Sequence, residues 1–278
     1  MFIHWFPGHM KRALVELENN LPMVDSVIYM LDARAPIACI NESFDKIIEN
    51  KPILYVINKS DLIPEKEALY WEDYFRKNDK NCVCINSLDS KSINRIVKEL
   101  KIINAPTIKK YKNKGVKRAP RVMVLGVPNC GKSTLINTLV GRKKSDVANT
   151  PGVTRTIKWT RIPRLGFDLL DSPGVLYPDF EDQEKAYYLA AIGSIKDARF
   201  DSIELAKWLY TKLFHKIPDA LCIRYGIDKQ ESPSLGLENI AKAREYYTDQ
   251  QKLDIERAAI TLINDFRNGA LGRVSLSN

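Results

Sequence analysis

The segment Gly126–Ser133, with the sequence GVPNCGKS, constrains the fold more than any other part of the chain. It matches the pattern G-x-x-x-x-G-K-[ST], follows an apolar run at 122–125 and precedes a helix-like stretch at 134–140. The glycines let backbone N–H groups converge on phosphate oxygens at a helix N-terminus, where the helix dipole favours negative charge. The segment therefore predicts a strand, a phosphate-binding loop and a helix within an α/β domain.

The same loop indicates roles for individual side chains. Lys132 is expected to bridge the β- and γ-phosphates of a nucleotide, and the Ser133 hydroxyl is expected to ligate Mg²⁺. Nucleotide contacts are expected from six consecutive residues, which are Asn129, Cys130, Gly131, Lys132, Ser133 and Thr134.

Short apolar runs recur through the first two thirds of the chain. They are bounded by polar turns, as buried parallel strands are, and occur at 26–31, 53–57, 82–85, 121–125 and 167–170. Helical stretches lie between them at 42–49, 65–77 and 92–100. This alternation predicts an α/β fold with a doubly wound, mostly parallel sheet.

The pattern changes from about Pro178 onward. Helical spacing then occupies 185–195, 203–214 and 237–266, interrupted by Pro218 and by the Ser-Pro-Ser segment at 232–234. We therefore expect two domains. An α/β domain spans 1–178, with a short N-terminal extension at 1–24, and a smaller all-helical domain spans 179–278.

Composition excludes several classes of protein. Of the 278 residues, 45% are hydrophobic and 28% are charged, which is typical of a globular chain and not of a disordered or fibrous one. No stretch approaches 18 uninterrupted apolar residues, so we expect no membrane-spanning helix. Residues 1–12 do not resemble a secretory signal, and an odd number of thinly spread cysteines suits a reducing cytoplasm. We expect a cytoplasmic protein.

Two further segments are suited to a magnesium-bound triphosphate. Asp171 and Gly174 follow the apolar run at 167–170, where the carboxylate can hold Mg²⁺ through water and the Gly174 N–H can contact a γ-phosphate. A threonine between this segment and the phosphate loop would complete the Mg²⁺ shell and sense the γ-phosphate. Thr154 is the first choice, and Thr150 and Thr156 remain alternatives.

The identity of the base is indicated by Asn58, Lys59, Ser60 and Asp61, which follow the apolar run at 53–57. A carboxylate placed there accepts hydrogen bonds from both N1–H and the exocyclic amine of guanine. Adenine lacks this donor pair and would leave the carboxylate unpaired, at a cost of a few kcal/mol. Asn86 and Ser87 follow the next run, where a backbone contact to the guanine oxygen is needed. The expected nucleotide is GTP or GDP.

The positive charge is concentrated in the middle of the chain. Residues 106–178 hold 15 basic and 3 acidic side chains, whereas the flanking parts are close to neutral. Such clustering is typical of a surface that binds nucleic acid, although a Lys-rich solvated linker is the alternative. The RNA-contact candidates are Lys109, Lys110, Lys112, Lys114, Lys117 and Arg118.

The order of these motifs distinguishes the chain from ordinary small GTPases, in which the phosphate loop comes first. Here the base-reading segments precede the phosphate loop, as in circularly permuted GTPases. Permutation keeps the site while moving the chain ends, because the termini of a domain often lie close together. The segment after Gly174 then leads directly into the helical domain, so nucleotide state can reorient that domain.

Within that group the chain closely resembles the YlqF/RbgA family of ribosome biogenesis GTPase A proteins, nearly end to end. The segments that carry the resemblance are Trp5–Met10, Asp32–Pro36, Asn58–Asp61, Gly126–Ser133, Thr150–Thr154, Asp171–Gly174 and Gly193–Asp197. The resemblance implies a GTPase that binds the large ribosomal subunit precursor and acts late in its assembly. It also implies a C-terminal helical domain that contacts ribosomal RNA, although residues 179–278 are slightly acidic here. We expect a monomer that binds neither DNA nor membranes.

The hydrolytic step needs a group that positions water. Ras-like enzymes place a glutamine after the D-x-x-G glycine, but this chain has Val175 there. His9 is one candidate for positioning water, the alternative being packing against Trp5 and Phe6 or contact with RNA. The other candidate is K⁺, since Asn129 occupies the position of a potassium ligand in GTPases of this general type. A nucleotide-gated RNA-binding module with incidental hydrolysis is the alternative function.

The potassium hypothesis predicts that GTP turnover is faster in KCl than in NaCl at equal ionic strength. A K⁺ ion held at Asn129 would offset charge that develops between the phosphates, and Na⁺ would fit the same ligands less well. Single-turnover rates in the two salts measure the effect, and equal rates would contradict it.

Overall fold

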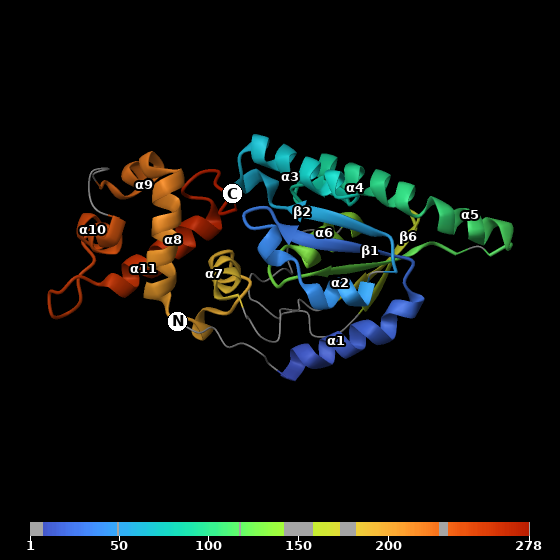
Figure 1. Cartoon of the computed structure of the whole chain (residues 1–278), viewed down its shortest axis with the longest axis horizontal. Helices are drawn as coiled ribbons and strands as arrows, with labels where there is room; N and C mark the ends of the chain where they lie inside the picture. Colours follow the sequence, from blue (N-terminus) through green and yellow to red (C-terminus); the bar gives the residue numbers. More distant parts are fainter. Residues whose placement is uncertain are drawn as a thin grey trace.

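The computed structural model describes residues 8–48, 50–116, 118–141, 158–172, 182–227 and 233–277. A six-stranded sheet in the order β3-β2-β1-β4-β6-β5 forms its centre (Figure 1). β5 pairs antiparallel with β6, and the other neighbours pair in parallel. The strands are β1 Ser26–Asp32, β2 Ile53–Asn58, β3 Asn81–Cys84, β4 Arg121–Gly126, β5 Lys158–Ile162 and β6 Phe167–Asp171.

Helices precede, connect and follow these strands. They are α1 Gly8–Asn20, α2 Glu42–Ile48, α3 Glu65–Lys77, α4 Ser90–Ile103, α5 Ala105–Asn113, α6 Lys132–Val140, α7 Gln183–Ala191, α8 Ser202–Lys216, α9 Pro218–Tyr225, α10 Gly236–Ala243 and α11 Ile255–Asn268. Two short 3₁₀ turns matter for the site, η2 Ile37–Cys39 and η3 Ser60–Leu62.

The central strands are buried along nearly their whole length because both faces of the sheet are covered. On one face Tyr29 of β1 stacks on Tyr55 of β2, with ring centroids 5.5 Å apart. Phe44 from α2 lies 5.9 Å from Tyr29, and Phe75 from α3 lies 5.0 Å from Tyr55. This row of four rings places α2 and α3 on the same face.

The opposite face is identified by strand alternation. Ser26 lies three residues before Tyr29, so its side chain points to the other side of β1. The Ser26 hydroxyl accepts a 2.9 Å hydrogen bond from Asn104, at the junction of α4 and α5. α4 therefore covers this second face, and α6 packs beside it. The sheet is wound on both faces, as the alternation of apolar runs predicted.

The chain changes direction between β1 and β4. It moves outward from β1 to β2 and β3, and then returns past β1 to β4 and β6. The loops at the carboxyl ends of β1 and β4 diverge at such a switch point, and ligands of open α/β sheets bind in the crevice between them. The phosphate-binding loop follows β4, so the topology places it at this crevice.

A helical region made of α8, α9, α10 and α11 lies at one end of the molecule, with α7 between it and the sheet (Figure 1). α8 buries Leu205, Leu209 and Leu213 on one face, where α11 packs against it. Asp201 caps the start of α8 by accepting hydrogen bonds from the N–H groups of Ile203 and Glu204. These apolar and capping positions explain why the helical spacing was visible in the sequence.

The expected α/β sheet followed by helices is confirmed, and the differences have physical causes. β5 was not predicted, because it is an edge strand whose sequence KWTRI shows no continuous apolar run. α5 has no buried residue and so carries no periodic signal. The helical stretch expected at 237–266 forms two helices, α10 and α11. The loop between them contains an antiparallel β-bridge between Tyr247 and Leu253. The expected boundary at 178 lies outside the described residues.

No helix in the described part of the chain is long and apolar enough to cross a membrane.

A test of the helical packing is Gly236→Ala, at the start of α10. A Cβ at this position would lie 2.3 Å from the ring of Tyr210, a buried residue of α8. Overpacking of this kind costs about 1–3 kcal/mol, so we expect a lower free energy of unfolding in urea. Leu235→Ala, which removes an exposed side chain from the same turn, is the control and is expected to cost less than about 0.5 kcal/mol. Equal stability of the two variants would contradict the packing.

Candidate nucleotide-binding site

The phosphate-binding loop connects β4 to α6 and requires glycine at both ends. Gly126 has φ +148°, and a Cβ there would lie 2.4 Å from the carbonyl oxygen of Met30. Gly131 has φ +100°, and a Cβ there would lie 2.2 Å from Nδ2 of Asn58. The Lys132 ammonium donates to the carbonyls of Gly126 and Val127, at 2.8 and 2.9 Å. The lysine therefore lies folded over its own loop, at the N-terminus of α6.

Asn58, at the end of β2, joins three loops. Its Nδ2 donates to the Cys130 carbonyl at 2.8 Å, within the phosphate-binding loop. Its Oδ1 accepts from the N–H and the hydroxyl of Ser87, at 3.0 and 2.7 Å, in the loop after β3. The side chain is 3% exposed, so these bonds have little competition from water. The structure thus brings together three segments that the sequence analysis assigned to one nucleotide.

The guanine contact expected from Asn86 and Ser87 stays a prediction, and both residues form hydrogen bonds within the protein. The Ser87 N–H donates to Oδ1 of Asn58. Asn86 accepts a 2.9 Å hydrogen bond from the N–H of Leu88, which shapes the loop locally.

The base-reading segment turns sharply after Asn58. Lys59 has φ +61°, in the left-handed region that a non-glycine residue enters only when its surroundings hold it there. The Ser60 N–H donates to the carbonyl of Ile85 at 3.0 Å, which ties the turn to the end of β3. Asp61 is exposed within η3, so its carboxylate is accessible to a ligand.

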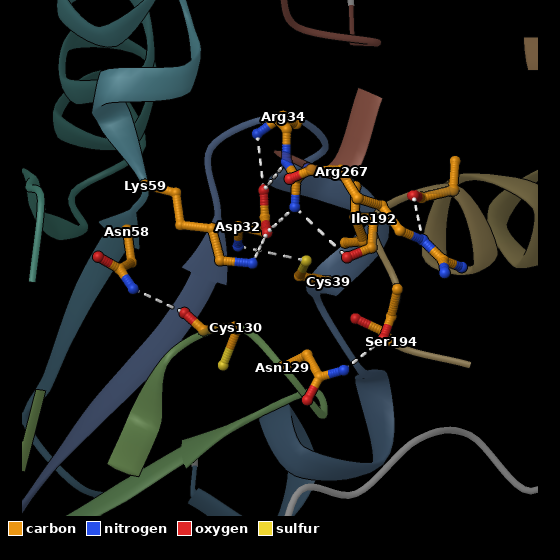
Figure 2. A network of polar contacts seen from close by, with 12 residues as sticks. Asp32, Arg34, Cys39, Asn58, Lys59, Asn129, Cys130, Ile192, Ser194 and Arg267 are labelled. Atoms are coloured by element: carbon orange, nitrogen blue, oxygen red, sulfur yellow. Dashed lines mark hydrogen bonds and ion pairs between the residues drawn. The ribbon is translucent and has the colours of Figure 1, made fainter. Parts of the chain in front are cut away.

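A buried carboxylate that the motifs did not assign lies behind this turn. Asp32, the last residue of β1, is 1% exposed and pairs with Lys59 at 2.7 Å (Figure 2). It also accepts two bonds from the Arg34 guanidinium, from Nε at 2.9 Å and from Nη2 at 2.8 Å. Burial alone would raise the pKa of the Asp32 carboxyl, but the charges of Arg34 and Lys59 outweigh burial and hold that pKa well below its usual range. Asp32 is therefore ionised at neutral pH.

Arg34 links this carboxylate to the helical region. Its guanidinium donates to the carbonyl of Ile192 after α7 at 3.3 Å, and to the carbonyl of Arg267 in α11 at 3.1 Å. Its own carbonyl accepts from the N–H of Leu276 at 2.8 Å. The buried Arg34 therefore contacts the C-terminal ends of α7 and α11 and also the segment that follows α11.

The phosphate-binding loop makes its own contacts with the turn after α7. The Asn129 amide donates to the Gly193 carbonyl at 2.7 Å, and the Ser194 hydroxyl donates to the Pro128 carbonyl at 2.8 Å. Arg267 holds the same turn by donating to the carbonyls of Ala190 and Ala191. The expected potassium ligand, Asn129, is therefore oriented by the turn after α7, which Arg267 connects to the helical region.

Asp171, at the end of β6, has the properties of a magnesium-shell carboxylate. Its Oδ1 is buried and has no hydrogen-bond partner among the described residues. Burial raises the pKa of this carboxyl, and the nearby Lys132 charge and the Ser172 N–H oppose that rise. An unpartnered carboxylate oxygen together with the Ser133 hydroxyl is the oxygen donor set that Mg²⁺ prefers. Asp171 and Ser133 are therefore suited to bind Mg²⁺.

Several expected site residues lie outside what the structure describes. Thr154 and Gly174, and with them Thr150, Thr156 and Val175, fall in the gaps at 142–157 and 173–181. Lys117 falls in another gap. His9 belongs to α1 by its backbone, and its side chain is outside the description. Their roles stay predictions.

The RNA-contact candidates lie away from the nucleotide loops. Lys109, Lys110 and Lys112 belong to α5 and Lys114 follows it, at the end of the molecule opposite the helical region (Figure 1). All four are exposed. Arg118 instead pairs with Asp25 at 3.0 Å, so its charge is partly balanced within the protein.

The sequence reasoning missed the structural role of Asp32 although a signal for it was present. Asp32 ends an apolar strand, as Asn58 and Asp171 do, and polar residues at that position meet at one sheet edge. The partners of Arg34 carried no such signal, because they are backbone carbonyls more than 150 residues away.

We predict that Arg34→Met lowers the free energy of unfolding by about 3–5 kcal/mol. The change removes one partner of a buried ion pair and leaves the other charge undercompensated. Urea unfolding of the full chain measures the loss. Arg76→Met breaks an exposed pair with Asp73 and is the control, with an expected cost of at most about 1 kcal/mol. Comparable losses in both variants would contradict the role given to Arg34.

Comparison with known proteins agrees with this geometry. A family model described as 50S ribosome-binding GTPase matches residues 121–218. The chain is 33% identical over 277 residues to ribosome biogenesis GTPase A of Bacillus licheniformis, covering 99% of this chain and 98% of that protein. It is 32% identical over 301 residues to mitochondrial ribosome-associated GTPase 1 of Ictalurus punctatus, covering 98% and 92%.

Two solved structures extend the similarity to the whole fold. GDP-bound YlqF and GNP-bound YlqF from T. maritima each match with a TM-score of 0.64 and 26% identity. The matches cover 94% and 96% of this chain, and 98% of each solved chain. With full-length identity above 30% and the same arrangement of sheet and helices, the chain belongs to the ribosome biogenesis GTPase A family.

Proposed function

We propose that this protein binds GTP at the carboxyl edge of the sheet, hydrolyses it, and couples hydrolysis to a late step in assembly of the large ribosomal subunit. The observation that carries the proposal is the junction at Asn58, which fixes the base-reading turn to the phosphate-binding loop and to the loop after β3. With these three loops held together by one side chain, the site recognises a guanine base and its phosphates at the same time.

Each part of the site has a role in nucleotide binding. Asp61 accepts the two guanine donors, the loop from Asn129 to Thr134 surrounds the phosphates, and Lys132 moves from its own carbonyls onto phosphate oxygens. Thr154 and Gly174 complete the γ-phosphate contacts. Mg²⁺, held by Ser133 and Thr154 directly and by Asp171 through water, would neutralise charge that develops on the phosphates.

Hydrolysis requires a group that positions water. Val175 cannot orient water, so His9 or a K⁺ ion at Asn129 supplies this function, and intrinsic turnover is slow. Asn129 donates to Gly193 in the turn after α7. Docking of the helical region on a partner can therefore reorient the residue that holds K⁺.

The proposed partner is the large ribosomal subunit precursor together with its ribosomal RNA. The names of the relatives and the basic segment at 106–178 support this partner. The protein is proposed to act as a monomer in the cytoplasm and to bind no DNA. All five cysteines are unpaired thiols, as a reducing compartment favours.

The proposal predicts that purified large ribosomal subunits increase GTP turnover by about tenfold or more, which corresponds to about 1.4 kcal/mol of activation free energy. Phosphate release by the full chain in KCl, with and without large subunits, measures the effect. Small subunits at the same concentration are the control and should leave the rate near its basal value.

The pattern of rates separates the alternatives. Binding to large subunits without any stimulation would favour a nucleotide-gated RNA-binding module over a ribosome-activated GTPase. Equal stimulation by both subunits would exclude large-subunit specificity. Ribosome-stimulated turnover that survives His9→Ala would remove His9 from the catalytic role.

A further inference from the structure

α5 is a helix that the protein core does not explain. It spans nine residues, Ala105–Asn113, and none of them is buried. An isolated helix of this length is only marginally stable in water, and most helices in proteins are stabilised by packing an apolar face. α5 projects at the end of the molecule opposite the helical region (Figure 1). Something other than a packed face must therefore hold it in place.

Polar anchors fix both ends of this helix. At its start, Asn104 is fully buried and donates to the Ser26 hydroxyl and to the Leu100 carbonyl, both at 2.9 Å. Toward its end, the Tyr111 hydroxyl donates to Asp25, the residue before β1. A flexible linker would not need two such anchors.

The Asp25 anchor is itself reinforced. Its carboxylate accepts bonds from Arg118 at 3.0 and 3.1 Å and from the N–H of Arg121 at 2.8 Å. The Arg118 guanidinium also lies over the Tyr111 ring, 4.6 Å from its centre. Asp25, Tyr111 and Arg118 thus form one cluster that ties α5 to the first and fourth strands.

The direction of each lysine on α5 follows from the position of Tyr111, which faces the body of the protein. Successive residues of an α-helix are separated by about 100° around its axis. With Tyr111 facing the body, Lys109 lies about 20° from the opposite direction, and Lys110 and Lys112 each lie about 80° from it. All three are exposed, as is Lys114 at the end of the helix. α5 contains no acidic residue, and none of these four lysines forms an ion pair within the described residues.

The chemistry of this outward face suits a phosphate backbone. Its charges are all lysines, which bind phosphates as point charges without the planar fork that reads base edges. The tyrosine that could stack on a base is held by Asp25. A-form RNA hides its base edges in a deep, narrow major groove, so an exposed basic helix contacts mainly its phosphates. Such contacts carry affinity and depend little on sequence.

We propose that α5 is a rigid basic arm that binds the phosphodiester backbone of RNA through Lys109, Lys110, Lys112 and Lys114, with Asp25 and Tyr111 as its anchor. The proposal rests on the proposed ribosomal function and deepens it. The nucleotide loops lie at the carboxyl edge, whereas the anchor lies where β1 begins. The arm therefore adds RNA affinity that is the same in the GDP-bound and GTP-bound states.

The test is the salt dependence of RNA binding by the full chain. The variant K109Q/K110Q/K112Q/K114Q is compared with K66Q/K77Q/K91Q/K98Q, which removes four exposed lysines from α3 and α4. Fluorescence anisotropy with a labelled RNA duplex of arbitrary sequence gives the slope of log K against log salt. Each lost phosphate contact reduces that slope by about 0.7–0.9. We expect a reduction of about 3 for the arm variant and less than about 1 for the control.

The anchor is tested separately with Tyr111→Phe, which keeps every lysine and removes the hydroxyl that bonds Asp25. We expect faster amide hydrogen exchange across α5 and weaker RNA binding with a nearly unchanged salt slope. Unchanged exchange in α5 would show that the anchor does not order the arm.

Other outcomes would overturn the proposal. They are an unchanged slope in the arm variant, an equal effect in the control variant, or a loss confined to one nucleotide state. Anionic lipid vesicles that bind the wild type more tightly than RNA, with the same lysine dependence, would point to a membrane surface instead. The arm variant can behave as expected while large subunits fail to stimulate GTP turnover by the wild type. That result would contradict the proposed function and still support RNA binding by α5.

Discussion

The ion pair between Asp32 and Arg34 is the interaction on which the rest of the site depends. A carboxylate that is 1% exposed is tolerated only because a bidentate guanidinium and the Lys59 ammonium neutralise it. The same arginine then binds carbonyls of two helices from the C-terminal part of the chain. The base-reading turn, the end of β1 and the helical region therefore all contact one charge cluster.

The sheet order explains how motifs that are rearranged in sequence meet in space. β2 comes before the phosphate-binding loop in sequence and is separated in the sheet from β4 by β1 alone. The Asn58 side chain at the end of β2 therefore lies near enough to donate to the Cys130 carbonyl in that loop. In sequence, α7 and then the helical region follow the segment at 171–174 that is expected to contact the γ-phosphate. Hydrogen bonds from Asn129 and Ser194 connect the phosphate-binding loop with the turn after α7, which precedes that region.

Much of the fold and part of the site were predictable from sequence. β1, β2 and β4 are buried on both faces and therefore show continuous apolar runs. Polar residues at the ends of β1, β2 and β6 mark the site edge. β5 and α5 were not predictable, since one is an edge strand and the other buries nothing. The contacts of Arg34 and Asn129 were also hidden, because their partners are backbone carbonyls, and any residue type supplies a carbonyl.

The hydrogen bonds between Arg34 and α11 join residues more than 230 positions apart. Contacts at such a separation form late, because the entropy of closing a long loop must be overcome before they contribute any stability. During synthesis β1 emerges first, and its arginine lacks these carbonyl partners until α11 has folded. The base-reading turn is therefore fully supported only in the last stage of folding. A chain whose helical region is still unfolded lacks the carbonyls that hold Arg34, so the turn after β2 lacks part of its support.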